Sequence, residues 1–426
     1  MRSLLGGPAR APALLAGALL AFACTGAWSQ EDLDALQLES AAVEQEAAPQ
    51  GKLFAEVAAG SARRRGTAGD TGTSRLSLDA AHNAAWSPTV RTTLSARLDA
   101  VHPSDGRFSG AVFSLREGYV SWQDERATLL LDVGRINLRN GPGYGYNPTD
   151  FLRDRAVRIF TTVNPSTIRE NRLGTFMLRG QRVWDSGSLA LSYAPHLADK
   201  AGDEELNLDP GATNDRHRWL ATLGTRWSDR VSSQLSLYGE DGSSPRWGAS
   251  ATALLTQSLV AHGEWSSGRE RDLLSRSLGT GGEEHVRQRG VLGLTYTTST
   301  KLSVTGELHY NGFALDDDAR RATAALDPMA IGAYFLGAQE RQDNAARKAL
   351  FVHATQQDLF VKNLELTVLA KFNRTDDSRM AWMDLRYRMR KMDVALQIQR
   401  NSGDAGSEFG TLPTRYAAEL LAVLYF

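Results

Sequence analysis

Hydrophobic and polar residues alternate along most of the chain after residue 52. Between residues 391 and 400 the odd positions are mostly polar, whereas the even positions hold Met392, Val394, Leu396 and Ile398. Successive side chains of a β-strand point to opposite faces, so this period of two predicts strands. Eighteen segments follow the pattern, at 53–60, 74–83, 89–101, 109–122, 126–137, 174–183, 187–195, 217–227, 230–240, 247–255, 258–267, 286–298, 301–311, 346–358, 361–372, 379–389, 391–400 and 414–426.

The last segment, 414–426, has one continuous apolar face, formed by Tyr416, Ala418, Leu420, Ala422, Leu424 and Phe426. The opposite face is mixed and becomes polar toward Arg415. With an aromatic residue near each end, the segment resembles the closing strand of a bacterial outer-membrane β-barrel. That family's terminal strand is recognised by the barrel-assembly machinery, so the resemblance implies that Phe426 is an assembly signal. The alternative is a half-buried strand of a soluble domain, but the repetition of the pattern along the chain favours the barrel.

The connections between the predicted strands differ in length according to strand parity. Tight turns follow the even strands, whereas longer loops follow odd strands at 61–73, 138–173, 196–216, 268–285, 312–345 and 401–413; the odd connections near 102–108, 241–246 and 373–378 are shorter. Outer-membrane barrels have short periplasmic turns and long outer loops. We therefore predict an all-β transmembrane antiparallel β-barrel over residues 53–426, with about 18 strands, or 16 if one hairpin is miscounted.

The tryptophans of the predicted barrel lie at strand ends. Four are beside predicted periplasmic turns and four beside predicted outer loops: Trp86, Trp122, Trp184 and Trp227, then Trp219, Trp247, Trp265 and Trp382. Indole rings prefer the headgroup level of a bilayer. These eight residues are therefore predicted to form two membrane-interface girdles.

Residues 1–29 are typical of a secretory signal peptide. Arg2 and Arg10 supply positive charge, 11–23 is a short apolar run, and 27–29 reads Ala-Trp-Ser, a small-x-small cleavage site. The alternative is a lipoprotein signal acylated at Cys24, although Ala21 stands where such signals usually carry leucine. Cleavage after residue 29 would leave no cysteine, which excludes disulfide and thiolate chemistry.

Residues 30–52 are acidic, with no basic residue before Lys52, and we expect a periplasmic leader there. A plug or a peptide that binds a periplasmic partner is the alternative. Loss of the two signal-peptide arginines changes the formal net charge from −1 to −3, which indicates no particular partner. The hydrophobic content is 42%, and one long apolar run lies near the N-terminus, so a bundle of membrane helices is excluded.

The segment 134–182 has the most unusual composition in the chain. It contains nine arginines and three acidic residues, a surplus of six positive charges. It begins with Val-Gly-Arg at 133–135 and continues through a glycine-rich stretch, 141–146, to Asn-Pro-Thr-Asp at 147–150. Glycine and proline interrupt strand pairing and permit tight turns. The strand phase breaks at Gly134-Arg135, which predicts a bulge that tips the chain inward.

These motifs, within roughly 109–184, resemble porin-type barrels of the substrate-specific and the exopolysaccharide-export kinds. The resemblance implies a channel narrowed by an inward-folded loop. Guanidinium groups suit carboxylate and phosphate, and arginine rings favour anions in pores. We therefore expect a basic pore constriction formed by Arg135, Arg139, Arg153, Arg155, Arg158, Arg179, Arg386 and Arg388. The alternative is that these arginines pair with Asp150, Asp154 and Glu170, or bind lipopolysaccharide phosphates.

Two further stretches have weaker signals. In the loop 312–345, helical spacing of Leu326, Met329, Ala330 and Ala333 predicts a short helix at the barrel mouth. The three aspartates at 316–318 lack the spacing of a Ca²⁺ loop, so we interpret them as solvated charge. Glu307 and His309 share one strand face with Ser303 and Thr305, and we interpret this set as polar lining. The chain has no nucleophile elbow, zinc spacing or phosphate loop, so we predict no enzyme, metal site or cofactor.

Together these patterns predict an integral protein of a Gram-negative outer membrane. We expect a porin-like channel for passive diffusion of small polar, and by charge anionic, solutes through a lumen narrowed by the arginine-rich loop. The expected partners are outer-membrane lipid and lipopolysaccharide, the assembly machinery and the solute, with no nucleic acid. The alternative is a barrel that exports or assembles a cell-surface polysaccharide and uses residues 30–52 to bind a periplasmic partner.

Overall fold

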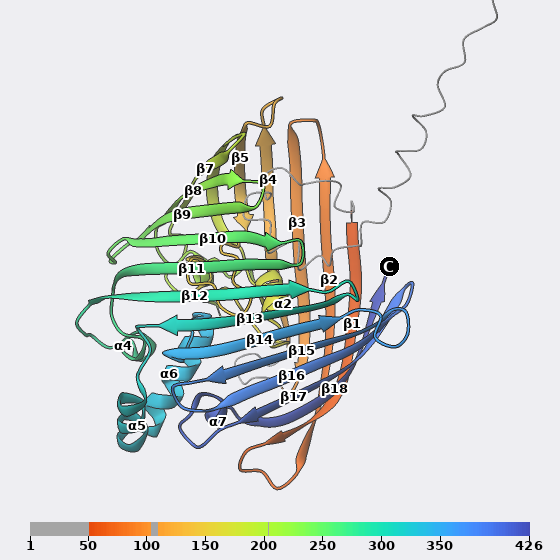
Figure 1. Ribbon diagram of the computed structural model, residues 1–426, viewed down its shortest axis with the longest axis vertical. Coiled ribbons are helices and arrows are strands. Elements are labelled where there is room, and N and C mark those ends of the chain that lie inside the picture. The colour runs from red at the N-terminus through yellow and green to blue at the C-terminus, as the bar shows by residue number, and fades with distance from the viewer. Residues whose placement is uncertain (1–50, 104–109, 203) are drawn as a thin grey trace, which may run out of the picture.

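The computed structural model describes residues 51–426 except 104–109 and 203, and within them 18 strands form one closed antiparallel sheet (Figure 1). The first strand pairs with both the second and the last, and Ala58 lies opposite Arg75 on one side and Leu421 on the other. The Phe426 amide donates to the Leu53 carbonyl at 3.0 Å. The predicted barrel is therefore confirmed, with 18 strands rather than 16.

The strands are β1 (Gly51–Arg64), β2 (Asp70–Ala85), β3 (Val90–His102), β4 (Ala111–Gln123), β5 (Leu129–Ile136), β6 (Thr175–Trp184), β7 (Gly187–Ala194), β8 (Arg218–Ser228), β9 (Val231–Glu240), β10 (Arg246–Thr256), β11 (Leu259–Glu270), β12 (His285–Thr297), β13 (Leu302–Asn311), β14 (Lys348–Gln356), β15 (Leu364–Asn373), β16 (Arg379–Arg388), β17 (Met392–Ser402) and β18 (Thr414–Tyr425). The helices are α2 (Pro165–Asn171), α3 (Pro210–Thr213), α4 (Leu273–Leu278), α5 (Asp317–Leu326), α6 (Pro328–Glu340) and α7 (Glu408–Thr411). None of these described helices has the length and apolarity needed to cross a bilayer.

The predicted sorting of connections by parity is confirmed. The two longest connections, 137–174 and 312–347, both follow odd strands, whereas most even strands end in tight turns such as 185–186. The first outer loop is shorter than predicted, at 65–69, because β1 and β2 pair almost to their ends. The predicted signal peptide and most of the leader lie outside the described residues, and β1 begins two residues before the predicted boundary, at Gly51.

The barrel is apolar outside and polar inside. On β2, Leu76 and Leu78 are exposed, whereas Ser77 between them and Arg75 and Asp79 on either side are buried. The Asp79 carboxylate faces inward and accepts a hydrogen bond from Arg116 at 2.6 Å. In a soluble β-sandwich the apolar faces of the sheets point inward. Here the apolar face of the sheet points outward, as in a transmembrane barrel.

Seven of the eight predicted girdle tryptophans are exposed on the barrel, and their position at the membrane interface stays a prediction. For Trp382 the prediction is wrong. Its side chain is 6% exposed and packs inside the barrel with Phe351, Leu369 and Met380. The cause is strand phase, because Trp382 shares the inward face of β16 with Asp384 and Arg386, whereas Met383 and Leu385 alternate with them.

The predicted mouth helix is two helices that meet at Asp327. The Asp327 carboxylate accepts from the amides of Met329 and Ala330, and Pro328 follows it, so Asp327 ends α5 and caps α6. Leu326 and Met329 are exposed rather than packed. The buried face of α6 consists instead of Ala330, Ile331, Tyr334, Phe335 and Ala338, and several of these pack on Leu273 of α4. In Figure 1 helices α4, α5 and α6 lie together at the long-loop end of the barrel.

The closing seam of the barrel requires a glycine. A Cβ at Gly60 of β1 would overlap the Ala418 carbonyl oxygen of β18.

We expect Gly60→Ala to destabilise the barrel by about 1–3 kcal/mol, the usual cost of overpacking. Thermal unfolding, followed by heat-modifiable gel migration, measures the change. Gly306→Ala on β13 is the matched control, because a Cβ there meets no atom within 4 Å; equal melting of the two variants would contradict the assignment of the seam.

Candidate functional site

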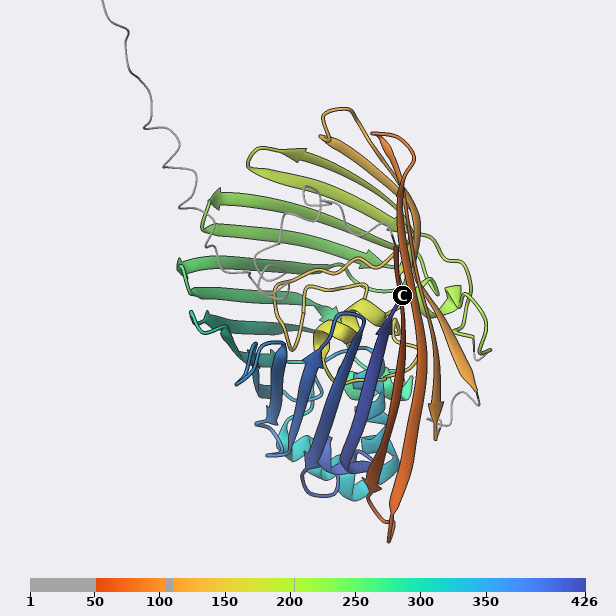
Figure 2. The same cartoon turned by 90° about the vertical axis from the view of Figure 1, so that its right-hand side faces the viewer.

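The connection 137–174 folds into the barrel instead of covering its mouth. The segment and its helix α2 lie within the outline of the barrel in both views (Figures 1 and 2). The predicted bulge is absent, because β5 keeps a continuous register with β4 and β6 through Gly134 and Arg135. Gly134 instead has a φ of 136°, a conformation that favours glycine, close to the backbone of Tyr119.

One buried carboxylate of the wall, Glu264 on β11, binds the loop through several donors. Its Oε1 accepts from the Gly143 amide at 2.6 Å and from the Asn147 side-chain amide at 3.0 Å. Its Oε2 accepts from the Thr149 amide at 3.1 Å and the Thr149 hydroxyl at 2.6 Å. A buried carboxylate needs such donors to replace its hydration. The loop is therefore tied to β11 at three residues.

A second buried carboxylate, Glu307 on β13, binds the loop beside the first. The amides of Tyr144 and Gly145 donate to it at 2.5 and 2.9 Å. The Nε2 atoms of His262 and His309 each lie 2.8 Å from its oxygens. The structure therefore places Glu307 and His309 in a buried tether and not on an exposed lumen surface.

The glycines of 141–146 permit this close approach. A Cβ at Gly145 would lie 2.6 Å from the Phe351 ring, and one at Gly141 or Gly143 would overlap atoms of Glu264 or Tyr146. Gly141 also has a φ of 85°. The glycine-rich composition is thus required by contact between the loop backbone and the wall.

The two ends of the loop are joined by Arg172. Its guanidinium donates to Asp150 at 2.8 Å, to the Leu138 carbonyl at 2.6 Å and to the Asn137 side chain at 2.8 Å. Arg172 and Asp150 are both almost fully buried. This ion pair fixes the Asn-Pro-Thr-Asp segment against the strand ends from which the loop departs.

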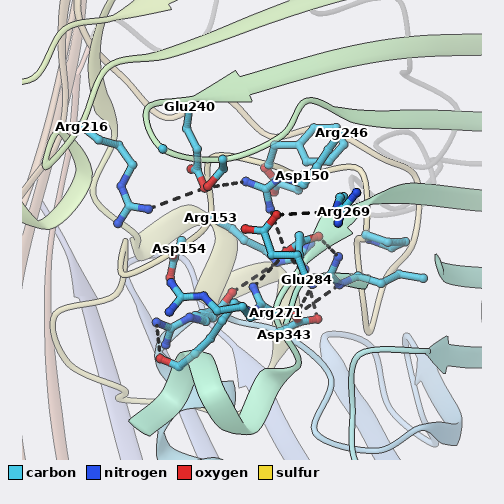
Figure 3. Close-up of a pocket in the computed structure, with 18 of the residues that line it drawn as sticks. Asp150, Arg153, Asp154, Arg216, Glu240, Arg246, Arg269, Arg271, Glu284 and Asp343 are labelled. Atoms are coloured by element: carbon cyan, nitrogen blue, oxygen red, sulfur yellow. Dashed lines mark hydrogen bonds and ion pairs between the residues drawn. The ribbon is translucent and has the colours of Figure 1, made fainter. Parts of the chain in front are cut away.

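An arginine-rich cavity of about 320 Å³ lies on one side of the loop, toward β9–β12 (Figure 3). Figure 3 shows Glu240 between Arg216 and Arg246, at 3.6 and 3.1 Å. The charged lining of this cavity consists of eight arginines and six acids: Arg153, Arg216, Arg246, Arg269, Arg271, Arg276, Arg289 and Arg341, with Asp150, Asp154, Glu240, Glu270, Glu284 and Asp343.

Asp343 connects the loop to the other elements around this cavity. It accepts from the Tyr146 hydroxyl at 2.6 Å, from Arg289 at 3.1 Å and from Arg276 at 3.3 Å. Burial alone would raise the pKa of the Asp343 carboxyl, but the charges of Arg289, Arg153 and Arg276 outweigh burial and lower its pKa well below the ordinary range. Asp343 is therefore a fixed negative charge among the arginines.

A second, apolar cavity of about 820 Å³ lies on the other side of the loop, along β14–β18 and β1–β3. Three residues line both cavities: Asp150, Arg153 and Asp343. Arg153 stacks over the Tyr146 ring at 5.2 Å and lies 3.5 Å from Asp343. The boundary between the two cavities is therefore a charged junction of one guanidinium and two carboxylates, where the Arg153 side chain is 11% exposed.

The predicted constriction arginines, all eight of which the structure describes, have different environments. Arg153 alone among them lines the two cavities. Arg135 and Arg158 are buried and donate to backbone carbonyls, for instance Arg158 to Phe113 at 2.5 Å and to Glu204 at 2.6 Å. Arg139 is exposed. Arg155 pairs with Asp215 at 2.6 Å.

The three predicted wall arginines point inward but are paired. Arg179 lies 3.1 Å from Asp132, Arg386 lies 3.0 Å from Asp384, and Arg388 lies 2.9 Å from Glu365. None of the three lines either cavity. The alternative pairing with Asp150, Asp154 and Glu170 is not found for Arg153, Arg155 and Arg158, which pair with Asp343, Asp215 and Asp209 of other loops. Asp150 pairs instead with Arg172. For Asp215, burial would raise the pKa, but Arg216 and Arg155 lower it to about 2.

Sequence reasoning missed the arginines that dominate the cavity, Arg246, Arg276 and Arg289. Arg289 could have been found, because it shares the inward face of β12 with Val291, whereas Leu292 and Leu294 are exposed. Asp343 had no comparable signal, since it lies in an irregular segment after α6. Within the described residues, no group of three His, Cys, Asp or Glu side chains is arranged to hold a metal ion.

The tether to Glu264 is testable. We expect Glu264→Ala to release the loop, because three residues lose hydrogen bonds to a charged acceptor. Trypsin cleavage of the folded barrel after Arg153 or Arg155 should then be at least about tenfold faster. Glu365→Ala, which removes one carboxylate beside Arg388 and no hydrogen bond described for the loop, is the control and should leave cleavage unchanged. Identical cleavage of the Glu264 variant and wild type would contradict the tether.

No family model and no curated protein matches the sequence. Two solved structures of Acinetobacter baumannii proteins are similar in fold. OccAB1 has a TM-score of 0.58 at 10% identity and covers 88% of this chain and 96% of its own. OccAB4 has a TM-score of 0.53 at 8% identity and covers 88% of this chain and 97% of its own. With the closed sheet, the inward loop and the apolar exterior, the chain has the fold of a porin-type outer-membrane barrel.

Proposed function

We propose that the protein is an outer-membrane channel through which small anionic solutes diffuse passively past Arg153. The observation that carries the proposal is the position of Arg153 at the boundary of both cavities. The fold supports a channel, and the charged lining supports a preference for anions. Selectivity would arise from the electric field and the donors along the lumen, without covalent chemistry.

The arginine-rich cavity favours anions by number and by geometry of charge. Eight guanidinium groups oppose six carboxylates, and each guanidinium is a planar donor that binds carboxylate or phosphate edge-on. Arg269 has a side chain that is 62% exposed, and its nearest carboxylate oxygen, of Glu284, is 4.0 Å away. Arg269 shares the outward face of β11 with Trp265, at the strand end that borders this cavity.

The same ion pairs keep anion binding weak. Arg246 and Arg276 lie 3.1 Å from Glu240 and Glu270 respectively, so a solute must compete with a fixed carboxylate at each step. Conduction requires binding that is favourable enough to admit a solute and weak enough to release it. The compensated arginines therefore fit passage better than capture.

Arg153 is oriented by its surroundings. Its guanidinium stacks on Tyr146, donates to the Asn147 carbonyl and lies 3.4 Å from the Arg341 carbonyl. The loop that presents it is tied to the wall by Glu264 and Glu307. The guanidinium is thus held at one position in the lumen. A fixed position is needed if this charge is to select anions at one point along the pathway.

The export alternative rests on residues 30–52, most of which lie outside the described residues. It stays a prediction, as does the partner proposed for that segment. Deletion of the leader separates the two functions, because a simple channel should still conduct.

The charge at the junction can be tested in planar bilayers. In a KCl gradient we expect wild type to be anion-selective. Arg153→Gln should lower the chloride-to-potassium permeability ratio about two- to fourfold, because one unit charge within roughly 5 Å of the path is removed in a wet lumen. Arg153→Lys should retain most of the selectivity, since it keeps the charge.

Arg155→Gln is the matched control, because Arg155 belongs to the same loop, pairs with Asp215 and lines neither cavity. It should behave like wild type. The proposal would be contradicted if wild type were cation-selective. It would also be contradicted if Arg153→Gln and Arg155→Gln had the same chloride-to-potassium permeability ratio.

A further inference from the structure

The larger cavity has an unexpected surface for the inside of a porin-type barrel. Most of its exposed lining is apolar, and its large apolar lining residues include the exposed Leu336 and Phe160 and the buried Phe335, Met380, Trp382 and Phe409. The lumen of such a barrel is ordinarily polar and filled with water. Enclosed apolar surface with a few polar groups is instead typical of a ligand-binding pocket.

Part of this apolar surface has no packing role. Met380, Trp382 and Phe409 are buried in a cluster that seats α7 against the wall. Leu336 is 62% exposed and Phe160 is 36% exposed, and both line the cavity. They come from two loops far apart in sequence, so the fold brings two large apolar side chains to one space and leaves them uncovered.

Leu336 takes no part in the apolar cluster that packs its helix on α4. The contacts of α6 with α4 are made by Ile331, Tyr334, Phe335 and Ala338. Leu336 lies on a different side of α6 and is absent from that cluster. Covering this leucine with the apolar part of a solute would be favourable, because apolar surface is then removed from water.

The charges around the apolar cavity specify the rest of the ligand. Six cationic side chains oppose four carboxylates in its lining. Arg172 and Lys371 are neutralised by Asp150 and Glu408, at 2.8 and 3.0 Å. Arg153 lies at the boundary with the arginine-rich cavity, 11% exposed and 3.5 Å from Asp343, so a negative group that binds it there would lie next to the apolar surface.

We propose that the apolar cavity binds the hydrophobic body of an amphiphilic anion whose charged group meets Arg153. This inference rests on the proposed function and deepens it, because it names the class of solute that the channel favours. Simple inorganic anions would use the arginine-rich cavity alone, whereas an anion with an apolar chain or ring would gain affinity from the second cavity.

A homologous series of linear alkanesulfonates, from ethanesulfonate to octanesulfonate, tests the inference, because their charge is permanent and only the apolar length changes. Each is added to the full-length barrel in a planar bilayer in KCl, and the block of the chloride current is titrated. The inhibition constant should fall roughly two- to fourfold for each added methylene until the cavity is full. Leu336→Gln should weaken the block by octanesulfonate about three- to tenfold and leave ethanesulfonate unchanged.

Leu326→Gln is the matched control, because Leu326 is 87% exposed on α5 and lines neither cavity. The inhibition constants of this variant should equal those of wild type at every chain length. Because partition of the sulfonates into the bilayer is the same for both proteins, the comparison also controls for it. Anion selectivity with no dependence of block on chain length, or with the same dependence in the Leu336 and Leu326 variants, overturns this inference alone. Cation selectivity in the same membranes overturns the proposed function as well.

Discussion

The structure depends on two buried carboxylates that accept hydrogen bonds from the backbone of an inward loop. Glu264 and Glu307 need donors because they are removed from water, and the amides of 143–149 need acceptors for the same reason. The wall supplies His262 and His309 to Glu307, but the hydrogen bonds described above for Glu264 all come from the loop, and the loop amides find their acceptors on the wall. The hydrogen bonds between these carboxylates and the loop amides place the loop across the lumen. The glycines at 141, 143 and 145 allow the loop backbone to approach the wall.

The position of the loop determines the chemistry of the space around it. On one side it faces an arginine-rich cavity, on the other a larger apolar cavity, and Arg153 stands at their boundary. Asp343 ties this boundary to Arg289 of the wall and Arg276 of α4. The proposed site of charge selection and the proposed site for an apolar body are therefore adjacent, and both depend on the position of this loop.

Much of the fold could be predicted because strand periodicity and loop parity are local signals. Leu76 and Leu78 reveal the outward face of β2 without knowledge of any other strand. The site was predicted less well, because the sequence of an irregular segment has no alternation that shows which side chains point inward. Arg135, Arg153 and Arg158 belong to one basic segment, yet the first and last bind carbonyls and only Arg153 reaches the cavities. Trp382 was misplaced because its position near a strand end was weighed above its phase.

The most direct test of this account is hydrogen–deuterium exchange of the folded barrel, with residue-level resolution over 141–149. The account predicts that the amides of Gly143, Tyr144, Gly145 and Thr149 exchange as slowly as those of the neighbouring strands β11 and β13. Exchange as fast as that of the exposed segment 280–284 would show that the loop is not held by the two glutamates, and the division of the lumen would have to be abandoned.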